Sequence, residues 1–235
     1  MQGLAIRRLV DDDKRVISLR RLVIDIRGSL DVLTREVYVA GSGLPYGADE
    51  ALQKALATGL VEGFWAPNTG PTAFFPSMQA HAAFDMLAGT QPDARTRDDR
   101  ISASLMKKLD DWLSDKDIKS IVDWSNKLVA HAADQERNQH LDFGSLRPTM
   151  AMVASAQRRL VRTAEVISAY ILRGPIHGAL VPVFQYSQFA KLESAMSNKN
   201  AIKIAQRRWG ELAKDRDQWT SGVLEELTGR PISGP

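Results

Sequence analysis

The sequence predicts an all-α fold, a helical bundle built from long helices. Apolar residues recur at spacings of three and four over most of the chain, whereas the alternating apolar and polar residues of strands are almost absent. The chain has 235 residues, 44% of them hydrophobic and 25% charged, which is an ordinary globular composition. This length can bury a substantial core without disulfides or metals. We therefore predict a single all-α domain over residues 1–235.

Composition excludes several classes of protein. The chain contains no cysteine, which rules out disulfides and thiolate metal sites. Its first residues lack the long apolar run of a signal peptide, and no stretch is apolar for long enough to span a membrane. We expect a soluble cytoplasmic protein with no membrane contact. The net charge of +3 permits nucleic-acid binding but does not argue strongly for it.

The first forty residues are expected to form one long helix, from about residue 4 to residue 40. Three acidic residues, Asp11 to Asp13, mark its start or a break near it. Burial of its apolar seam against another helix of the chain is preferred over use of the seam in dimerisation. The seam consists of Val16, Leu19, Val23, Ile26, Leu30, Leu33 and Val37.

Glycine and proline divide the next part of the chain. Residues 41–47 read as a turn rather than a phosphate-binding loop, because no strand precedes them and no Lys-Ser/Thr pair follows. A short helix is expected over residues 48–60. After a loop at 67–71, a further helix should run from Pro76 to about residue 88, where Gly89 ends it.

His81 and Asp85 lie four residues apart on that helix, which could be half of a metal site. No second pair is evident, so we favour an ordinary contact on the helix face. We expect neither a metal nor another cofactor.

Helices are also expected over most of the remaining chain. Their predicted ranges are 101–113, from about 115 to 133, 150–172 and 187–228, and the last carries a seam of Ile202, Ala205, Trp209, Leu212, Arg216, Trp219, Val223 and Leu227.

The end of the second of these helices carries the residues best suited to chemistry. Lys127 and His131 are four apart and should stack on one face, with Asn126 on its flank. A cation, an amide and an imidazole together can hold a phosphate and move a proton. A capping or surface role for His131 is the alternative, since a helix C-terminus favours a histidine.

Three arginines, Arg158, Arg159 and Arg162, cluster on the 150–172 helix away from its apolar seam. They could contact RNA phosphates. A solvated helix face is the alternative explanation, because helices routinely place charge opposite the core.

The stretch Lys127-Leu-Val-Ala-His131-Ala-Ala-Asp134, with the helices around it, resembles the abortive-infection AbiU-like branch of the HEPN superfamily. The resemblance covers residues 84–172, rather less than half of the chain. It implies a four- or five-helix HEPN-like core at about 76–172, with helices 4–40 and 187–228 packed on it. HEPN domains are often metal-independent endoribonucleases that work as homodimers.

Carried over residue by residue, the resemblance gives His131 the role of general base or acid and gives Asn126 the role of orienting it. The motif arginine falls on Ser125, which cannot supply a cation. Lys127 and Arg137 could partly replace that charge. The resemblance further implies RNA as a partner, an antitoxin or regulatory protein as another, and a setting in phage defence or a toxin-antitoxin system.

Two other interpretations are open. A catalytically degenerate interaction or dimerisation module would use the two apolar seams for partner contacts. A metal-dependent hydrolase using His81, Asp85, His131 and Asp134 is disfavoured, because those residues lack standard ligand spacing.

Overall fold

The computed structural model describes residues 2–59, 67–132, 147–174 and 199–231, of which residues 128–132 and 199–202 are described by their backbone alone. This part of the chain is helical and contains no strand, which confirms the predicted all-α class. Its elements are α1 (Gln2–Leu9), α2 (Leu19–Gly28), α3 (Arg35–Ala40), α4 (Ala48–Ala57), α5 (Phe74–Ala88), the 3₁₀ turn η1 (Pro92–Ala94), α6 (Ala103–Leu113), α7 (Lys116–Ala132), α8 (Met150–Glu165), the π-helical turn η3 (Val166–Ile171), α10 (Lys199–Asp217) and α11 (Val223–Thr228).

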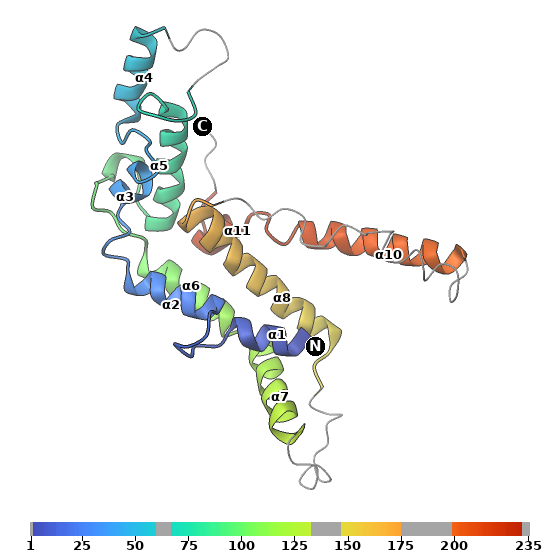
Figure 1. Cartoon of the computed structure of the whole chain (residues 1–235). Helices are drawn as coiled ribbons and strands as arrows, with labels where there is room; N and C mark the ends of the chain where they lie inside the picture. The colour runs from blue at the N-terminus through green and yellow to red at the C-terminus, as the bar shows by residue number, and fades with distance from the viewer. Residues whose placement is uncertain (1, 60–66, 133–146, 175–198, 232–235) are drawn as a thin grey trace.

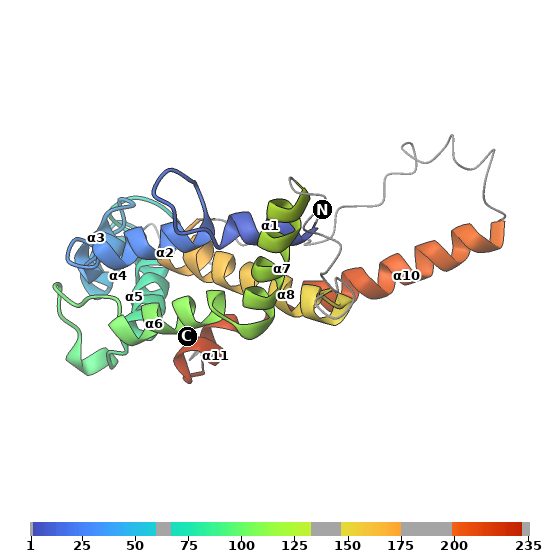
Figure 2. The same ribbon diagram turned by 90° about the horizontal axis from the view of Figure 1, so that it is seen from below.

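Helix α8 lies at the centre of the main bundle, and α1, α2, α6 and α7 pack beside it (Figures 1 and 2). One continuous apolar core joins these helices to α5 and α11. Each fully buried large aliphatic side chain contributes about 1.5–3 kcal/mol of transfer free energy. Among the core side chains are Val23, Phe84, Leu87, Met106, Leu109, Leu113, Ile118, Ile121, Ile167, Leu224 and Leu227.

Polar caps and one glycine set several helix boundaries. The side chains of Ser18 and Thr149 accept hydrogen bonds from the backbone amides of Arg21 and Met152, which begins α2 and α8. Gly89 ends α5 in the left-handed conformation, with φ of 77°. The predicted end of this helix is therefore confirmed.

The predicted single helix over residues 4–40 is wrong. The chain instead forms α1, α2 and the short α3, separated by turns. The Asp11–Asp13 segment makes local hydrogen bonds, and the Ser18 hydroxyl donates to the carbonyl of Asp11. These contacts end the helix between α1 and α2 although the apolar spacing continues. The last residue of the predicted seam, Val37, is 53% exposed.

The helix from Met150 ends in a π-helical turn rather than in a regular one. The amide of Leu172 donates to the carbonyl of Ile167, five residues back, at 2.8 Å. Arg173 then adopts φ of 53°, which is strained for a residue with a Cβ. Its guanidinium donates to the Tyr38 carbonyl, and the Tyr38 hydroxyl donates to the Tyr170 carbonyl at 2.6 Å. These bonds tie α3 to the π turn.

The predicted continuous seam of the last helix is interrupted. Helix α10 ends at Asp217, and a turn leads through Gly222, with φ of 61°, into α11. Trp219, Val223 and Leu227 of that seam are buried, whereas α10 projects from the bundle in both views (Figures 1 and 2). Within the described ranges, no helix is long and apolar enough to cross a membrane.

Candidate functional site: the α7 motif and the α8 arginine pocket

Among the α7 motif residues whose side chains the structure describes, Ser125 does not share a surface with Asn126 and Lys127. Ser125 is fully buried, whereas Asn126 and Lys127 are exposed. His131 belongs to α7 by its backbone, but its side chain lies outside the described part of the chain, as does Arg137. Consecutive helical residues point about 100° apart, so Ser125 faces the bundle when its two successors face solvent.

The partner of Ser125 is α1. A Cβ placed on Gly3 would lie 3.0 Å from the Ser125 hydroxyl and 3.3 Å from the Trp124 ring. The two helices therefore pack closely at this point, and the Ser125 hydroxyl has no hydrogen-bond partner among the described residues. The position that the resemblance assigns to the catalytic arginine is thus buried in the interface between α1 and α7, where there is no room for a guanidinium.

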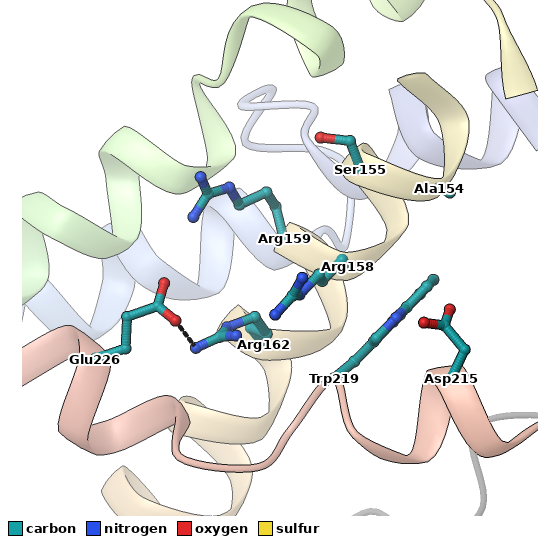
Figure 3. Close-up of a pocket in the computed structure, with 8 residues that line it drawn as sticks. All are labelled: Ala154, Ser155, Arg158, Arg159, Arg162, Asp215, Trp219 and Glu226. Atoms are coloured by element: carbon teal, nitrogen blue, oxygen red, sulfur yellow. Dashed lines mark hydrogen bonds and ion pairs between the residues drawn. The ribbon is translucent and has the colours of Figure 1, made fainter. Parts of the chain in front are cut away.

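The three arginines of α8 do come together, on one side of a pocket of about 400 Å³. Ala154, Ser155, Arg158, Arg159 and Arg162 repeat along one face of the helix. Figure 3 shows Arg158 and Arg162 projecting from α8 toward the chain that carries Trp219 and Glu226. That chain, from the end of α10 to α11, closes the other side with Asp215, Trp219 and Glu226.

Arg162 is a buried cation rather than part of a solvated face. Its side chain is 3% exposed and pairs with Glu226 at 2.5 Å. Burial lowers the pKa of Arg162, the Glu226 carboxylate opposes that shift, and the neighbouring cations of Arg158 and Arg159 add to it. Its Nε has no hydrogen-bond partner. A further anion in the pocket would relieve the repulsion between the arginines.

The other two arginines are more accessible. Arg158 is exposed, and Arg159 is half-buried with its guanidinium 5.7 Å from the Trp112 ring centre. Neither makes an ion pair with a carboxylate of the described residues. Three arginines face the two carboxylates of Asp215 and Glu226, which leaves an excess of positive charge beside the buried Trp219 ring. This arrangement can bind a phosphate.

His81 and Asp85 serve the packing of α5, as the sequence favoured. The Nε2 of His81 donates to the Tyr46 carbonyl at 2.8 Å. Asp85 pairs with Arg35 at 2.8 Å and with Arg95 at 2.5 Å. No cluster of three or more metal-ligating side chains occurs in the ranges that the structure describes.

The sequence did not indicate that Trp219 and Glu226 belong to the pocket. They lie about sixty to seventy residues from the α8 arginines, so no local spacing joins them. The paired burial of Arg162 was missed for the same reason. No family model, curated protein or solved structure matches the chain.

Proposed function

We propose that this protein is a helical RNA-binding protein that contacts the RNA backbone through the α8 arginine pocket. The observation that carries the proposal is the exposed Arg158 beside the half-buried Arg159, with an indole ring across the pocket. Arginine is suited to phosphate because its planar fork of donors can bind two oxygens at once. Aromatic rings beside such cations are common where unpaired bases are bound.

The proposal treats the HEPN-like centre as degenerate. A HEPN-type mechanism needs a fixed cation near the histidine, and the corresponding Ser125 is buried against α1. The exposed Lys127 supplies a flexible point charge without the fork of an arginine. Binding of RNA, rather than its cleavage, is the activity that these positions support best.

The test is binding of a fluorescently labelled twenty-nucleotide single-stranded RNA, followed by anisotropy at several salt concentrations. The double variant Arg158→Ala with Arg159→Ala should weaken binding by about tenfold or more, since each lost charged hydrogen bond costs about 1.5–3 kcal/mol. It should also flatten the dependence of affinity on salt. The double variant Arg8→Ala with Arg27→Ala, which removes two exposed arginines of α1 and α2, is the matched control and should change little.

The proposal fails if the unmodified protein does not bind this RNA, or if both variants weaken binding equally. Equal weakening would mean that net charge, and not the pocket, attracts the RNA.

A second function, a helix-mediated interaction module, is favoured by α10. This helix projects from the bundle and leaves Ile204 59% exposed and Leu212 36% exposed. Exposed aliphatic residues on a projecting helix are suited to a second copy or to a partner helix. If α10 joins two copies, light scattering coupled to gel filtration should give a dimer mass, which Ile204→Glu reduces to that of a monomer.

A further inference from the structure

A second cavity, of about 630 Å³, lies against the face of α5 that carries Phe75, Met78 and Ala82, and it borders on the core residues Met86 and Leu224. It is bounded by α5, by the loop that contains η1, by the π-helical turn, by α11 and by residues 230–231. Its walls are largely apolar. Their main contributors are Phe75, Met78, Ala82, Met86, Tyr170 and Leu224.

The sequence of α5 explains why this wall is apolar. The helix is hydrophobic around most of its circumference. One face buries Ala80, Phe84 and Leu87 in the protein. On the cavity side, Phe75 remains 40% exposed and Met78 44% exposed. A helix that is apolar on both faces normally has both faces covered. The cavity face therefore lacks the cover that its composition requires.

The rim of the cavity carries a positive charge that forms no ion pair with a carboxylate of the described residues. The Arg230 guanidinium donates to the carbonyls of Gly89 at 2.8 Å and of Thr90 at 3.2 Å. Carbonyl acceptors hold the group in place but do not neutralise it.

The charge of the cavity's second arginine, Arg95, is already neutralised by a carboxylate. Arg95 forms a bidentate pair with Asp85, through Nε at 3.1 Å and Nη2 at 2.5 Å. Asp85 also pairs with Arg35, which has Asp99 as its other carboxylate. Two arginines and two aspartates therefore compensate one another, and among the described side chains that line the cavity the charge of Arg230 is the excess.

We propose that this cavity binds a small organic anion with an apolar body, of the class of a medium-chain fatty acid. The hydrocarbon chain would lie between Met78 and Leu224, and the carboxylate would meet Arg230. The volume falls within the range of about 300–1,000 Å³ that is usual for small-molecule sites. An apolar wall with one charged group at its rim is also the usual pattern of such sites.

The experiment is calorimetric titration of the full chain with dodecanoate below its micelle concentration. Dodecyltrimethylammonium, which has the same chain and the opposite charge, is titrated in parallel. Dodecanoate should bind, and the cationic amphiphile should bind at least tenfold more weakly. Arg230→Gln should weaken dodecanoate about tenfold, because a charged hydrogen bond is lost. Ala82→Trp should fill the cavity and abolish binding.

Ala82 is an exposed helical position, so Ala82→Trp should leave the fold intact, which circular dichroism would check. Arg100→Gln removes an exposed arginine outside the cavity and should leave the affinity unchanged. Absence of dodecanoate binding would overturn the proposal. Undiminished binding in Ala82→Trp would also overturn it, because the ligand would then bind outside this cavity. So would equal binding of the two amphiphiles, because the site would then recognise the apolar chain and not the negative charge.

Discussion

The Ser125 hydroxyl and Gly3 lie against each other where α7 packs on α1. A Cβ at residue 3 would lie 3.0 Å from the hydroxyl oxygen, which is closer than ordinary van der Waals contact, so a side chain there would force its neighbours to shift by a few tenths of an ångström. Ser125 is small for the same reason. At the position that the HEPN resemblance assigns to a catalytic arginine, the packing of the bundle requires a small residue.

The first prediction concerns the size of residue 125. Ser125→Ala should stabilise the protein by up to about 1 kcal/mol, because it removes a buried hydroxyl that has no partner. Ser125→Arg should cost more than about 3 kcal/mol, because it forces an unpaired charge into the interface. Urea unfolding measures both changes. Asn126→Arg, at the exposed neighbour, should have little effect, and a folded, stable Ser125→Arg protein would contradict the packing argument.

The second prediction concerns Arg35, the largest fully buried side chain. Its guanidinium pairs with Asp85 and Asp99, each at 2.8 Å. Arg35→Met should destabilise the protein by about 3–5 kcal/mol, because it removes the cation that pairs with Asp99 and one of the two cations that pair with Asp85. The measurement is the free energy of unfolding in urea. Lys107→Met breaks the exposed ion pair with Asp111 and should change the free energy of unfolding little. Equal losses of unfolding free energy in the two variants would show that the buried pairs of Arg35 stabilise the protein no more than an exposed pair does.

The third prediction is a dependence of stability on pH. Burial lowers the pKa of His81 below its usual value of 6.5, although the hydrogen bond to Tyr46 opposes the shift. The cations of Arg95 and Arg35 lower it further. The unfolded chain therefore binds a proton more readily than the folded one. Stability is greatest above pH 6.5 and falls as the pH decreases below it.

The melting temperature should accordingly fall by a few degrees between pH 7 and pH 5. His81→Gln keeps a donor for the Tyr46 carbonyl and removes the titration, so its melting temperature should fall less. The pKa of Asp99 is lowered, because hydrogen bonds from Thr96 and Arg35 oppose the effect of burial. Its stabilising contribution is therefore fully present above its usual pKa of 3.8 and is lost only below that pH, outside the range tested. Identical slopes in the two proteins above pH 5 would show that His81 is not responsible.

Apolar spacing predicted the fold class and most helices, because helical periodicity reports which face is buried. It failed where the spacing continues across a turn. Leu19 and Val23 continue the apolar spacing that begins at Val16. Ser18, which lies between Val16 and Leu19, nevertheless caps the start of a new helix. Val223 likewise continues the seam of α10, although the chain leaves the helix at Asp217 and Gly222, in the left-handed conformation, begins α11. In both places a local capping or glycine preference overrides a periodic signal.

The site could be predicted only where its residues share one helix. The spacing of Arg158, Arg159 and Arg162 is visible in the sequence, and the structure places all three on one pocket. Glu226, which neutralises Arg162, is brought there by tertiary packing. The burial of Ser125 depends likewise on Gly3, more than a hundred residues away.

The last prediction is that the protein binds RNA without cutting it. A labelled RNA incubated with the protein in EDTA should stay intact on a denaturing gel, because no fixed cation occupies the motif position at Ser125. Loss of one such charge-stabilising donor typically costs a factor of about 10²–10³ in rate. His131→Ala should therefore behave like the unmodified protein in both cleavage and binding. Cleavage that leaves 2′,3′-cyclic phosphate ends and disappears in His131→Ala would instead establish a ribonuclease, and Lys127→Ala would then test whether the exposed lysine replaces the missing arginine.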